Sequence, residues 1–394
     1  MRNLKRALSL GLTAAMISGL MVMGSSAASY ADVTSEDNVE AIDVLEAVGI
    51  MIGDENGNFN PDQNVTRNEM AVVMANLMEY NVASYKDTSP FTDVPAWAEP
   101  YVAACYTNGI TSGYSDTVYG GSDTVTTAQA ALMLMKALGY FQYASDFGSD
   151  WQLATTRQGN AIDLFVGVDS GVTQAMTRND VAQLVLNTLE AGTVTASTDG
   201  SWSIGDIVIN NNVTYNSVTS NADYAESIHK VQSTDSNTDA GRSIVELGEQ
   251  LYQGDLRLRE GTTDDFGRPS RTWSYENSEI GTYADTPDLT YTAKVEAGDI
   301  YKDLGLGSSV NKNNVTVYVN GVEEDDLALS IRKGSDDKVG ESANGVLTEV
   351  YYDEEADTVL VAQIHTYVGT VVRTVEATDN RDAKPTGCDQ YHPD

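Results

Sequence analysis

The sequence has few cysteines and few histidines, and both shortages narrow what it can encode. Its two cysteines, Cys105 and Cys388, lie far apart in unlike surroundings. A chain held together by disulfides would usually carry more, so the fold must rest on hydrophobic cores. The three histidines, His229, His365 and His392, do not stand at metal-ligand spacing from one another. We therefore predict no metal site and no cofactor.

Basic residues are scarce as well. The chain has 23 Lys and Arg against 58 Asp and Glu, a formal charge of −35. Such a surface repels nucleic acid and anionic lipid, so we expect neither as a partner. The same acidity suits a protein that recruits divalent cations, and a role for calcium in assembly stays open.

Long apolar runs are missing except at the N-terminus. Arg2, Lys5 and Arg6 precede an apolar stretch over 7–23, and small residues follow over 24–31. This order is typical of a secretory signal, cleaved before Ser29 or Asp32. The alternative is a retained membrane anchor. No later run approaches the roughly 18 apolar residues of a membrane span, so we predict a signal peptide over 1–31 and an extracytoplasmic protein.

An internal repeat dominates the first half. Displacing the chain by 60 positions superposes 49–78 on 109–138, and a third copy repeats the pattern, with 176–180 matching 65–69. Each copy is typical of a helix, a Gly- and Asp-rich loop, and a second helix. The second helices begin at capping-box patterns: Thr66 with Glu69, Thr126 with Gln129, and Thr177 with Asp180. One helical pair cannot bury its apolar stripe alone, so we predict an all-α pseudo-threefold bundle.

Capping does not explain Arg67 and Arg178. Both stand at the first helical position, where the helix dipole disfavours a cation by a few tenths of a kcal/mol. A guanidinium beside free helix-start amides makes a cradle for carboxylate or phosphate. The alternative is an ion pair with Glu or Asp of a neighbouring repeat.

The motif order resembles the S-layer homology family over about residues 32–192. The resemblance rests on Phe91-Thr92-Asp93-Val94-Pro95, Trp97-Ala98, Gly109-Ile110-Thr111-Ser112-Gly113, and Val65-Thr66-Arg67-Asn68-Glu69 after the loop that begins at Gly53. It implies three repeats whose grooves bind secondary cell-wall polysaccharide, often a pyruvylated amino sugar. The binding residues that it implies are Arg67, Arg178, Glu69, Asp180, Asp93, Trp97, Gly53 and Gly113.

Departures from the family pattern limit this expectation. Thr127 stands where the second copy should carry its arginine, and Gln129 where it should carry its acid. The first copy retains only Ala31-Asp32-Val33 of the opening motif, and the third lacks it, although Trp151 can replace its packing. We therefore expect at most two competent grooves. Asp93 and Trp97 could contact sugar, but an Asp before a helix and a Trp on it are more often a helix cap and a core residue.

The second half of the chain has a different composition and residue pattern. We divide the mature chain into repeats over 32–88, 89–142 and 143–192, a polar linker with a short strand over 193–240, a β-rich, sandwich-like region over 241–378, and a polar tail over 379–394 where the chain could be truncated. Strand patterns cover 289–295, 315–319, 346–352, 358–365 and 367–375, with a type I′ turn signal at Asn320-Gly321. A short helix is predicted around 243–252.

No catalytic constellation is visible in this half, so we predict a protein that is not an enzyme. The favoured function is non-catalytic anchoring of a surface-layer or cell-surface protein to wall polysaccharide, with self-assembly through the β-rich region. Two alternatives stay open: an anchored carbohydrate-active enzyme, and an adhesin. In both, the β-rich half would be the active region.

Overall fold

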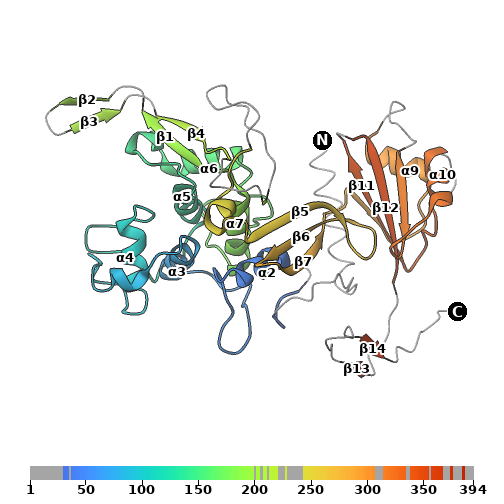
Figure 1. The fold of residues 1–394 in the computed structure, drawn as a ribbon, viewed down its shortest axis with the longest axis horizontal. Coiled ribbons are helices and arrows are strands. Elements are labelled where there is room, and N and C mark those ends of the chain that lie inside the picture. The colour runs from blue at the N-terminus through green and yellow to red at the C-terminus, as the bar shows by residue number, and fades with distance from the viewer. Residues whose placement is uncertain are drawn as a thin grey trace. The chain divides into compact units, whose positions relative to one another are not determined.

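The computed structural model describes residues 30–34, 37–198, 201–204, 207–210, 213–220, 227–228, 243–306, 314–333, 338–354, 356–366, 373–375 and 384–386 (Figure 1). The predicted signal peptide before Tyr30, His229, His392, Cys388 and most of the predicted tail lie outside these residues. The chain divides into an N-terminal unit, residues 26–259 with 272–281, and a C-terminal unit, whose described part comprises 260–271 and residues from 282 onward. In the described residues, no helix has the length and apolarity to cross a membrane.

Helices form the core of the N-terminal unit. Helix α2 packs on α7, α3 on α4, and α5 on α6. Fully buried side chains such as Leu45, Met74 and Leu134 supply the apolar contacts. The helices are α2 (Val39–Ala47), α3 (Arg67–Leu77), α4 (Glu99–Thr107), α5 (Thr127–Ala137), α6 (Trp151–Ala161) and α7 (Arg178–Glu190), with 3-10 turns η1 (Val82–Tyr85) and η2 (Ala144–Phe147).

The three repeats meet in a closed ring of backbone hydrogen bonds just before α3, α5 and α7. Val65 N–H donates to the Met176 carbonyl at 2.9 Å, Met176 to Val125 at 3.0 Å, and Val125 back to Val65 at 2.9 Å. Each apolar residue of this ring is buried. The ring therefore fixes the three helix starts against one another.

The predicted capping boxes are confirmed in α3 and α5. Thr66 Oγ1 accepts from Glu69 N, and Glu69 Oε2 accepts from Thr66 N; Thr126 and Gln129 do the same. In α7 only the Thr177 hydroxyl caps, accepting from Asp180 N. Asp is one methylene shorter than Glu, and its carboxylate turns to the neighbouring loop instead.

The predicted all-α character of the N-terminal region was wrong. Strands β1 (Val194–Thr198) and β4 (Val213–Ser217) pair antiparallel and continue from the third repeat, and Val194 N–H donates to the Leu138 carbonyl at the end of α5. This pair occupies part of the predicted linker. Strands β2 (Ser201–Ile204) and β3 (Ile207–Asn210) form a separate pair, and α8 (Leu247–Tyr252) packs on α7.

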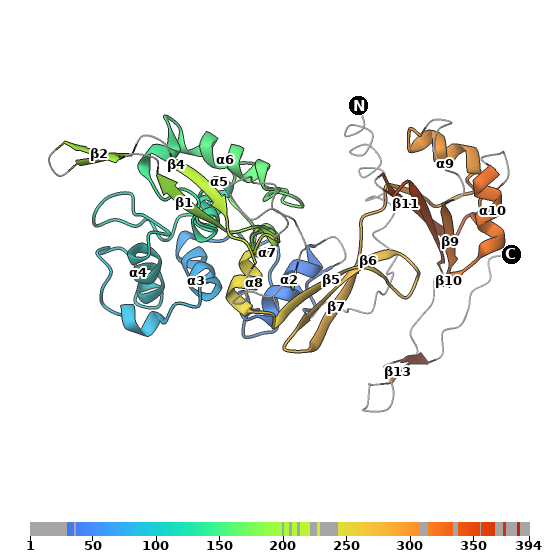
Figure 2. The same ribbon diagram turned by 45° about the horizontal axis from the view of Figure 1, so that its top comes forward.

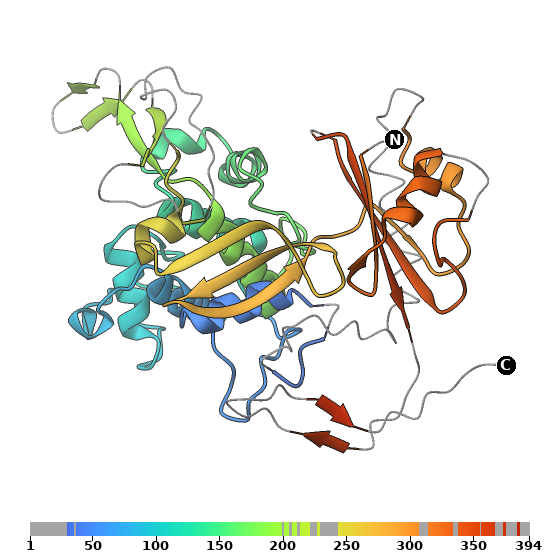
Figure 3. The ribbon, with the colours of Figure 1, turned by 45° about the vertical axis from the view of Figure 1, so that its right-hand side comes forward.

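A three-stranded sheet contributes residues to both units. It comprises β5 (Leu256–Thr263), β6 (Pro269–Tyr275) and β7 (Ser278–Ala284). Within the N-terminal unit, Trp273 is fully buried and its Nε1 donates to Glu40 Oε1 of α2 at 2.5 Å. The part of the sheet that belongs to this unit runs beside α2 (Figure 3). Backbone pairing after the repeats thus completes a mixed α/β unit.

The C-terminal unit holds a sheet in the order β10-β9-β12-β11-β8, in which β9 and β12 run parallel. Helices α9 and α10, rather than a second sheet, cover one face of it (Figure 2). The predicted sandwich-like region was therefore wrong too. The elements are β8 (Leu289–Tyr291), α9 (Ala297–Asp303), β9 (Val315–Val319), β10 (Val322–Glu323), α10 (Asp325–Lys333), β11 (Val346–Asp353) and β12 (Thr358–His365), with β13 (Arg373–Val375) and β14 (Lys384–Thr386) as a separate pair.

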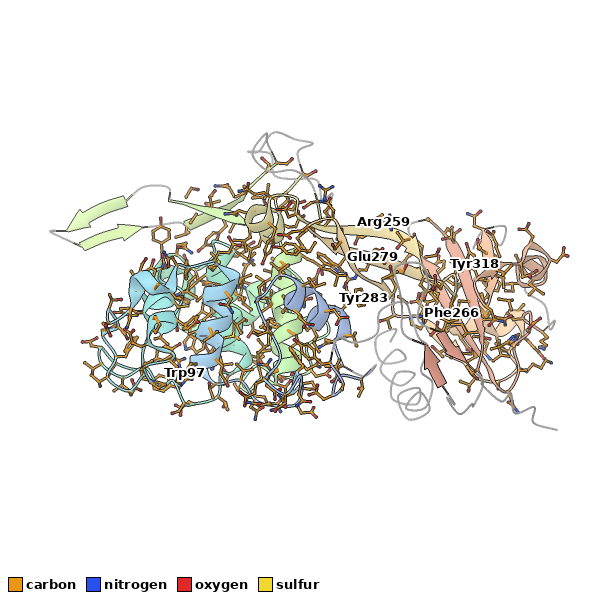
Figure 4. All side chains as sticks on the ribbon, turned by 60° about the horizontal axis from the view of Figure 1, so that its bottom comes forward. Trp97, Arg259, Phe266, Glu279, Tyr283 and Tyr318 are labelled. Carbon is orange, nitrogen blue, oxygen red and sulfur yellow. The ribbon has the colours of Figure 1, made fainter. Side chains whose placement is uncertain are left out.

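In the C-terminal unit the sequence predicted the turn at Asn320-Gly321 but neither of the helices α9 and α10. Asn320 and Gly321 have φ of 49° and 83°, as the predicted type I′ turn requires, and the strands predicted over 346–352 and 358–365 pair as the antiparallel hairpin β11–β12. The β5–β6 turn also packs on this sheet. Gly267 lies so close to Tyr318 that a Cβ at Gly267 would lie 2.2 Å from its ring. Figure 4 shows Tyr318 and the neighbouring Phe266. Arg268 Nε contacts Asp264 Oδ2 at 2.6 Å there.

Candidate functional site

Arg67 reaches from the first repeat into the loop of the second. Its Nη2 donates to the Ser112 carbonyl at 2.8 Å and its Nε to the Tyr119 carbonyl at 3.3 Å. The guanidinium lies 4.8 Å from the Tyr114 ring centre and 4.6 Å from that of Tyr119. Only 6% of the residue is exposed. Arg67 therefore holds two repeats together as well as lining a groove.

Arg178 repeats this arrangement between the third repeat and the first. Its Nε donates to the Phe59 carbonyl at 2.6 Å and its Nη2 to the Ile52 carbonyl at 2.9 Å. Thr127 takes the corresponding place in the second repeat, where its hydroxyl donates to the Ser170 carbonyl at 3.3 Å. The shorter threonine keeps the contact between repeats but brings no charge.

The helix-start amides that were predicted to form part of the anion cradle already donate hydrogen bonds to groups of the protein. In α3, Arg67 N–H donates to the Asp123 carbonyl, Asn68 N–H to the Gly121 carbonyl, and Glu69 N–H to Thr66 Oγ1. These are three of the amides that a helix start leaves without a partner inside the helix. An anion at this position would therefore meet side chains rather than helix-start amides.

A pocket of about 430 Å³ opens beside Arg67. We call it the Arg67 groove. Tyr114 comes from the second-repeat loop and is 57% exposed; Trp151 begins α6 and is 36% exposed. Its lining residues are Arg67, Ile110, Thr111, Ser112, Gly113, Tyr114, Gln129, Leu132, Met133, Lys136, Phe147 and Trp151.

The Arg67 groove contains two cationic side chains. Lys136 Nζ donates to the Gly109 carbonyl at 2.9 Å, and burial lowers the pKa of Lys136. The charge of Arg67 favours ionisation of the nearby Asp93 carboxyl and lowers its pKa. Burial opposes its ionisation, but hydrogen bonds from Tyr119 N and Gly120 N, each 2.8 Å, outweigh that and hold the pKa of Asp93 below its ordinary value. Asp93 is thus tied to backbone amides, and the pocket lining itself carries no acid.

The equivalent surface beside Arg178 has a different charge. We call it the Arg178 groove because of this correspondence alone: Arg178, Ile52, Gly53, Asp54, Glu69 and Asn76 occupy the positions that match residues of the Arg67 groove. Burial lowers the pKa of Arg178, while the carboxylates of Glu69, Asp54 and Asp32 act in the opposite direction. Asp54 corresponds to Tyr114, Glu69 to Gln129, and Asn76 to Lys136. Three carboxylates thus favour the charged form of Arg178.

The remaining predicted site residues have structural contacts. Gly53 and Gly113 are packed so closely that a Cβ would lie 2.3 Å from the Tyr30 and Phe91 rings respectively. Asp180 is 4% exposed and accepts from Asp169 N and Ser170 Oγ. Trp97 lies just before α4, 56% exposed, at the edge of the helical part (Figure 4). A direct role of these residues in binding stays a prediction.

Four residues were not predicted as part of the site, although Trp151 was named as a packing residue. Tyr114, Lys136 and Trp151 line the Arg67 groove but come from a loop and two helices, so no motif groups them. Tyr30 takes the place of Phe91, packing against Phe59 at 5.6 Å as Phe91 packs against Tyr119 at 5.3 Å. Superposing the chain on itself with a displacement of 61 rather than 60 positions aligns Tyr30 with Phe91 and Asp32 with Asp93. This alignment would have identified Tyr30 as the counterpart of Phe91.

Cys105 packs as a buried hydrophobic residue. It is fully buried, and burial raises its thiol pKa to about 12. Among the residues that the structure describes, no group of three or more His, Cys, Asp or Glu side chains could hold a metal ion.

Repeats joined by capped helix starts, with an aromatic and cationic groove between two of them, define an S-layer homology type of module. The profile of the S-layer homology domain matches residues 29–71 and 90–131, so the chain carries at least two such domains, as the motif order predicted. These matches and the relatives below place the protein at the cell surface.

Three curated relatives show the extent of the similarity. A surface-layer 125 kDa protein of Lysinibacillus sphaericus is 32% identical over 130 residues, 32% of this chain and 11% of that protein. A surface layer protein of Brevibacillus choshinensis is 28% identical over 130 residues, again 32% of this chain and 11% of that protein. A cell surface protein of Thermoanaerobacter kivui is 25% identical over 216 residues, 53% of this chain and 27% of that protein. The chain spans only a small part of each.

Proposed function

We propose that this protein is a non-catalytic surface protein that binds an acidic wall polysaccharide through the Arg67 groove. The single observation that supports this is the grouping of Arg67 and Lys136 with two partly exposed aromatic rings in one open pocket. Cell-surface relatives that share the repeats support the setting.

The chemistry of the groove suits a sugar with an acid group. Trp151 and Tyr114 offer flat apolar faces with polar edges, against which a sugar ring can stack. Gln129, Thr111 and Ser112 offer uncharged polar groups for hydroxyls. Lys136 and the outer edge of Arg67 would meet a carboxylate such as a pyruvyl group, in a pocket where partial desolvation strengthens the attraction.

The Arg178 groove is a poor site for the same ligand. Asp54 and Glu69 stand where the Arg67 groove has uncharged side chains, and Asn76 replaces Lys136. An anion there would face like charges, each worth on the order of 1 kcal/mol at 4 Å in water. We therefore assign Arg178 a structural role, as the contact between the third and first repeats.

The test is binding of the full secreted chain to purified wall polysaccharide, native or stripped of its acid groups. Lys136→Asn should weaken binding to native polysaccharide about fivefold, roughly 1 kcal/mol, and should reduce its sensitivity to salt. The matched control, Asn76→Lys, changes the corresponding position and should not weaken binding. Equal binding of native and stripped polysaccharide would refute the role of the acid group. No binding of either would refute the anchor.

A further inference from the structure

A second pocket lies next to the Arg67 groove in the N-terminal unit. Its volume is about 360 Å³. It opens between η2, α6 and strand β4, so the strand pair that follows the third repeat closes it. Its lining residues are Tyr140, Phe141, Ser145, Asp146, Ala154, Arg157, Gln158, Val213 and Tyr215. We call it the Arg157 pocket.

The two pockets share a wall. Phe147 lines the Arg67 groove and Phe141 lines the Arg157 pocket, and their rings stack at 5.2 Å with planes 11° apart. Helix α6 also serves both. Trp151 lines the groove, and Ala154 and Arg157, three and six residues later on the same helix, line the pocket. Six helical residues span about 9 Å, a distance within reach of a short run of linked sugars.

Hydrogen bonds and a ring contact connect the walls of the Arg157 pocket. The Tyr215 hydroxyl donates to Asp146 Oδ2 and accepts from Phe141 N at 2.8 Å. Asp146 Oδ2 also accepts from Tyr143 N at 2.9 Å. The Tyr140 and Tyr215 rings lie 5.0 Å apart and form the aromatic side of the pocket.

Two groups in this pocket have no assigned role in the fold. The side chains of Arg157 and Ser145 are exposed, and neither has a hydrogen-bond or ion-pair partner among the residues that the structure describes. A guanidinium recognises carboxylate by paired hydrogen bonds. Beside it stand hydroxyl, amide and aromatic groups, the set that recognises a sugar.

We propose that the Arg157 pocket is a second subsite, which takes a further acidic sugar of the polysaccharide bound in the Arg67 groove. This inference rests on the proposed function. Arg157 pairs with the acid group of that sugar, while Ser145, Gln158 and the free oxygen of Asp146 take its hydroxyls. Together the two pockets bind a stretch of chain rather than one sugar.

The test is calorimetric titration of the full secreted chain with polysaccharide fragments of increasing length. Wild type should bind longer fragments more tightly than single repeating units. Arg157→Ala should leave affinity for the shortest binding fragment unchanged and lose about tenfold for the longest, roughly 1.4 kcal/mol. Lys86→Ala is the matched control: it removes one exposed positive charge outside both pockets and should behave as wild type.

Two outcomes overturn the inference and leave the proposed function intact. One is equal affinity of wild type for short and long fragments. The other is an Arg157→Ala protein that binds long fragments as tightly as wild type. Failure of wild type to bind any fragment would instead refute the proposed function. Thermal unfolding of each variant confirms that the exposed substitution leaves the fold unchanged.

Discussion

The Arg67 and Arg178 grooves have the same backbone arrangement, each with an arginine at the same position, but the side chains around that arginine differ in charge. Both guanidiniums donate to two carbonyls of the next repeat loop. Around Arg67 stand Tyr114, Gln129 and Lys136; around Arg178, the same positions hold Asp54, Glu69 and Asn76. The motif arginine therefore marks the junction between repeats, and the residues around it decide whether the junction binds an anion.

A chain of such negative charge can bind an acidic polymer where cations are grouped locally. Its formal charge of −35 opposes anionic ligands in general. Surface charges act over about one Debye length, roughly 8 Å at physiological salt. A local pair of cations in a partly enclosed groove can therefore outweigh the distant acids.

The largest expected difference follows from removing each arginine. Arg67→Ala should lower the free energy of unfolding by about 2–3 kcal/mol, because it leaves two carbonyls without a donor and removes a contact with two tyrosine rings. It should also reduce polysaccharide binding more than tenfold. Arg178→Ala, in a less buried position, should destabilise less and leave binding within about twofold. Denaturant unfolding and binding assays check both.

Thr127→Ala is the control for these two variants, since it alters the third junction without removing a charge. We expect it to cost well under the arginine variants in stability, about 1 kcal/mol, and to leave binding unchanged. If Arg178→Ala lost as much binding as Arg67→Ala, the distinction between the grooves would be wrong.

The next effect tests the aromatic faces. Trp151→Ala should weaken binding about tenfold, roughly 1.4 kcal/mol, because the sugar loses its stacking surface. Trp97→Ala, just before the corresponding helix of the preceding repeat, should change binding little. Tryptophan emission should shift on adding polysaccharide to wild type and to Trp97→Ala, but not to Trp151→Ala. A shift that disappears in Trp97→Ala instead would place the ligand elsewhere.

A smaller effect comes from exchanging one residue between the grooves. Tyr114→Asp gives the Arg67 groove the acid of its counterpart and should weaken binding about fivefold, more at low salt than at high salt. Asp54→Tyr makes the reverse change and should not weaken binding. Titrations at two salt concentrations measure both. Tighter binding by Tyr114→Asp would contradict an acidic ligand.

Local features of the fold could be predicted from sequence because they depend on neighbours in the chain. The capping boxes of Thr66 and Thr126 and the Asn320-Gly321 turn follow from spacing and composition. The mixed α/β character could not, since β1 and β4 become ordered by pairing across a polar stretch and α9 and α10 by packing on a sheet. Short elements of this kind are stabilised by tertiary contacts more than by propensity.

The Arg67 groove, too, could be predicted from the sequence only in part. The arginines were predicted from their odd position at helix starts, but not that the neighbouring loops already occupy the amides. Trp151 and Lys136 belong to successive helices of different repeats, so only folding reveals that they face Arg67. Pairing each residue with its counterpart in the next repeat recovers the charge difference, which the motif alone conceals.

The smallest expected effect concerns the acid behind the Arg67 groove. Asp93→Asn replaces a carboxylate that accepts from two backbone amides with a group that can accept through only one oxygen. The pKa of Asp93 in the folded protein lies below the ordinary value of 3.8. Its stabilising effect is therefore full above about pH 4 and is lost as pH falls through the lower, folded pKa. The variant should melt a few degrees below wild type at pH 7, and the gap should narrow toward pH 3. A gap that widened in acid would mean that the folded protein favours protonated Asp93, and that the two amide hydrogen bonds do not set its ionisation.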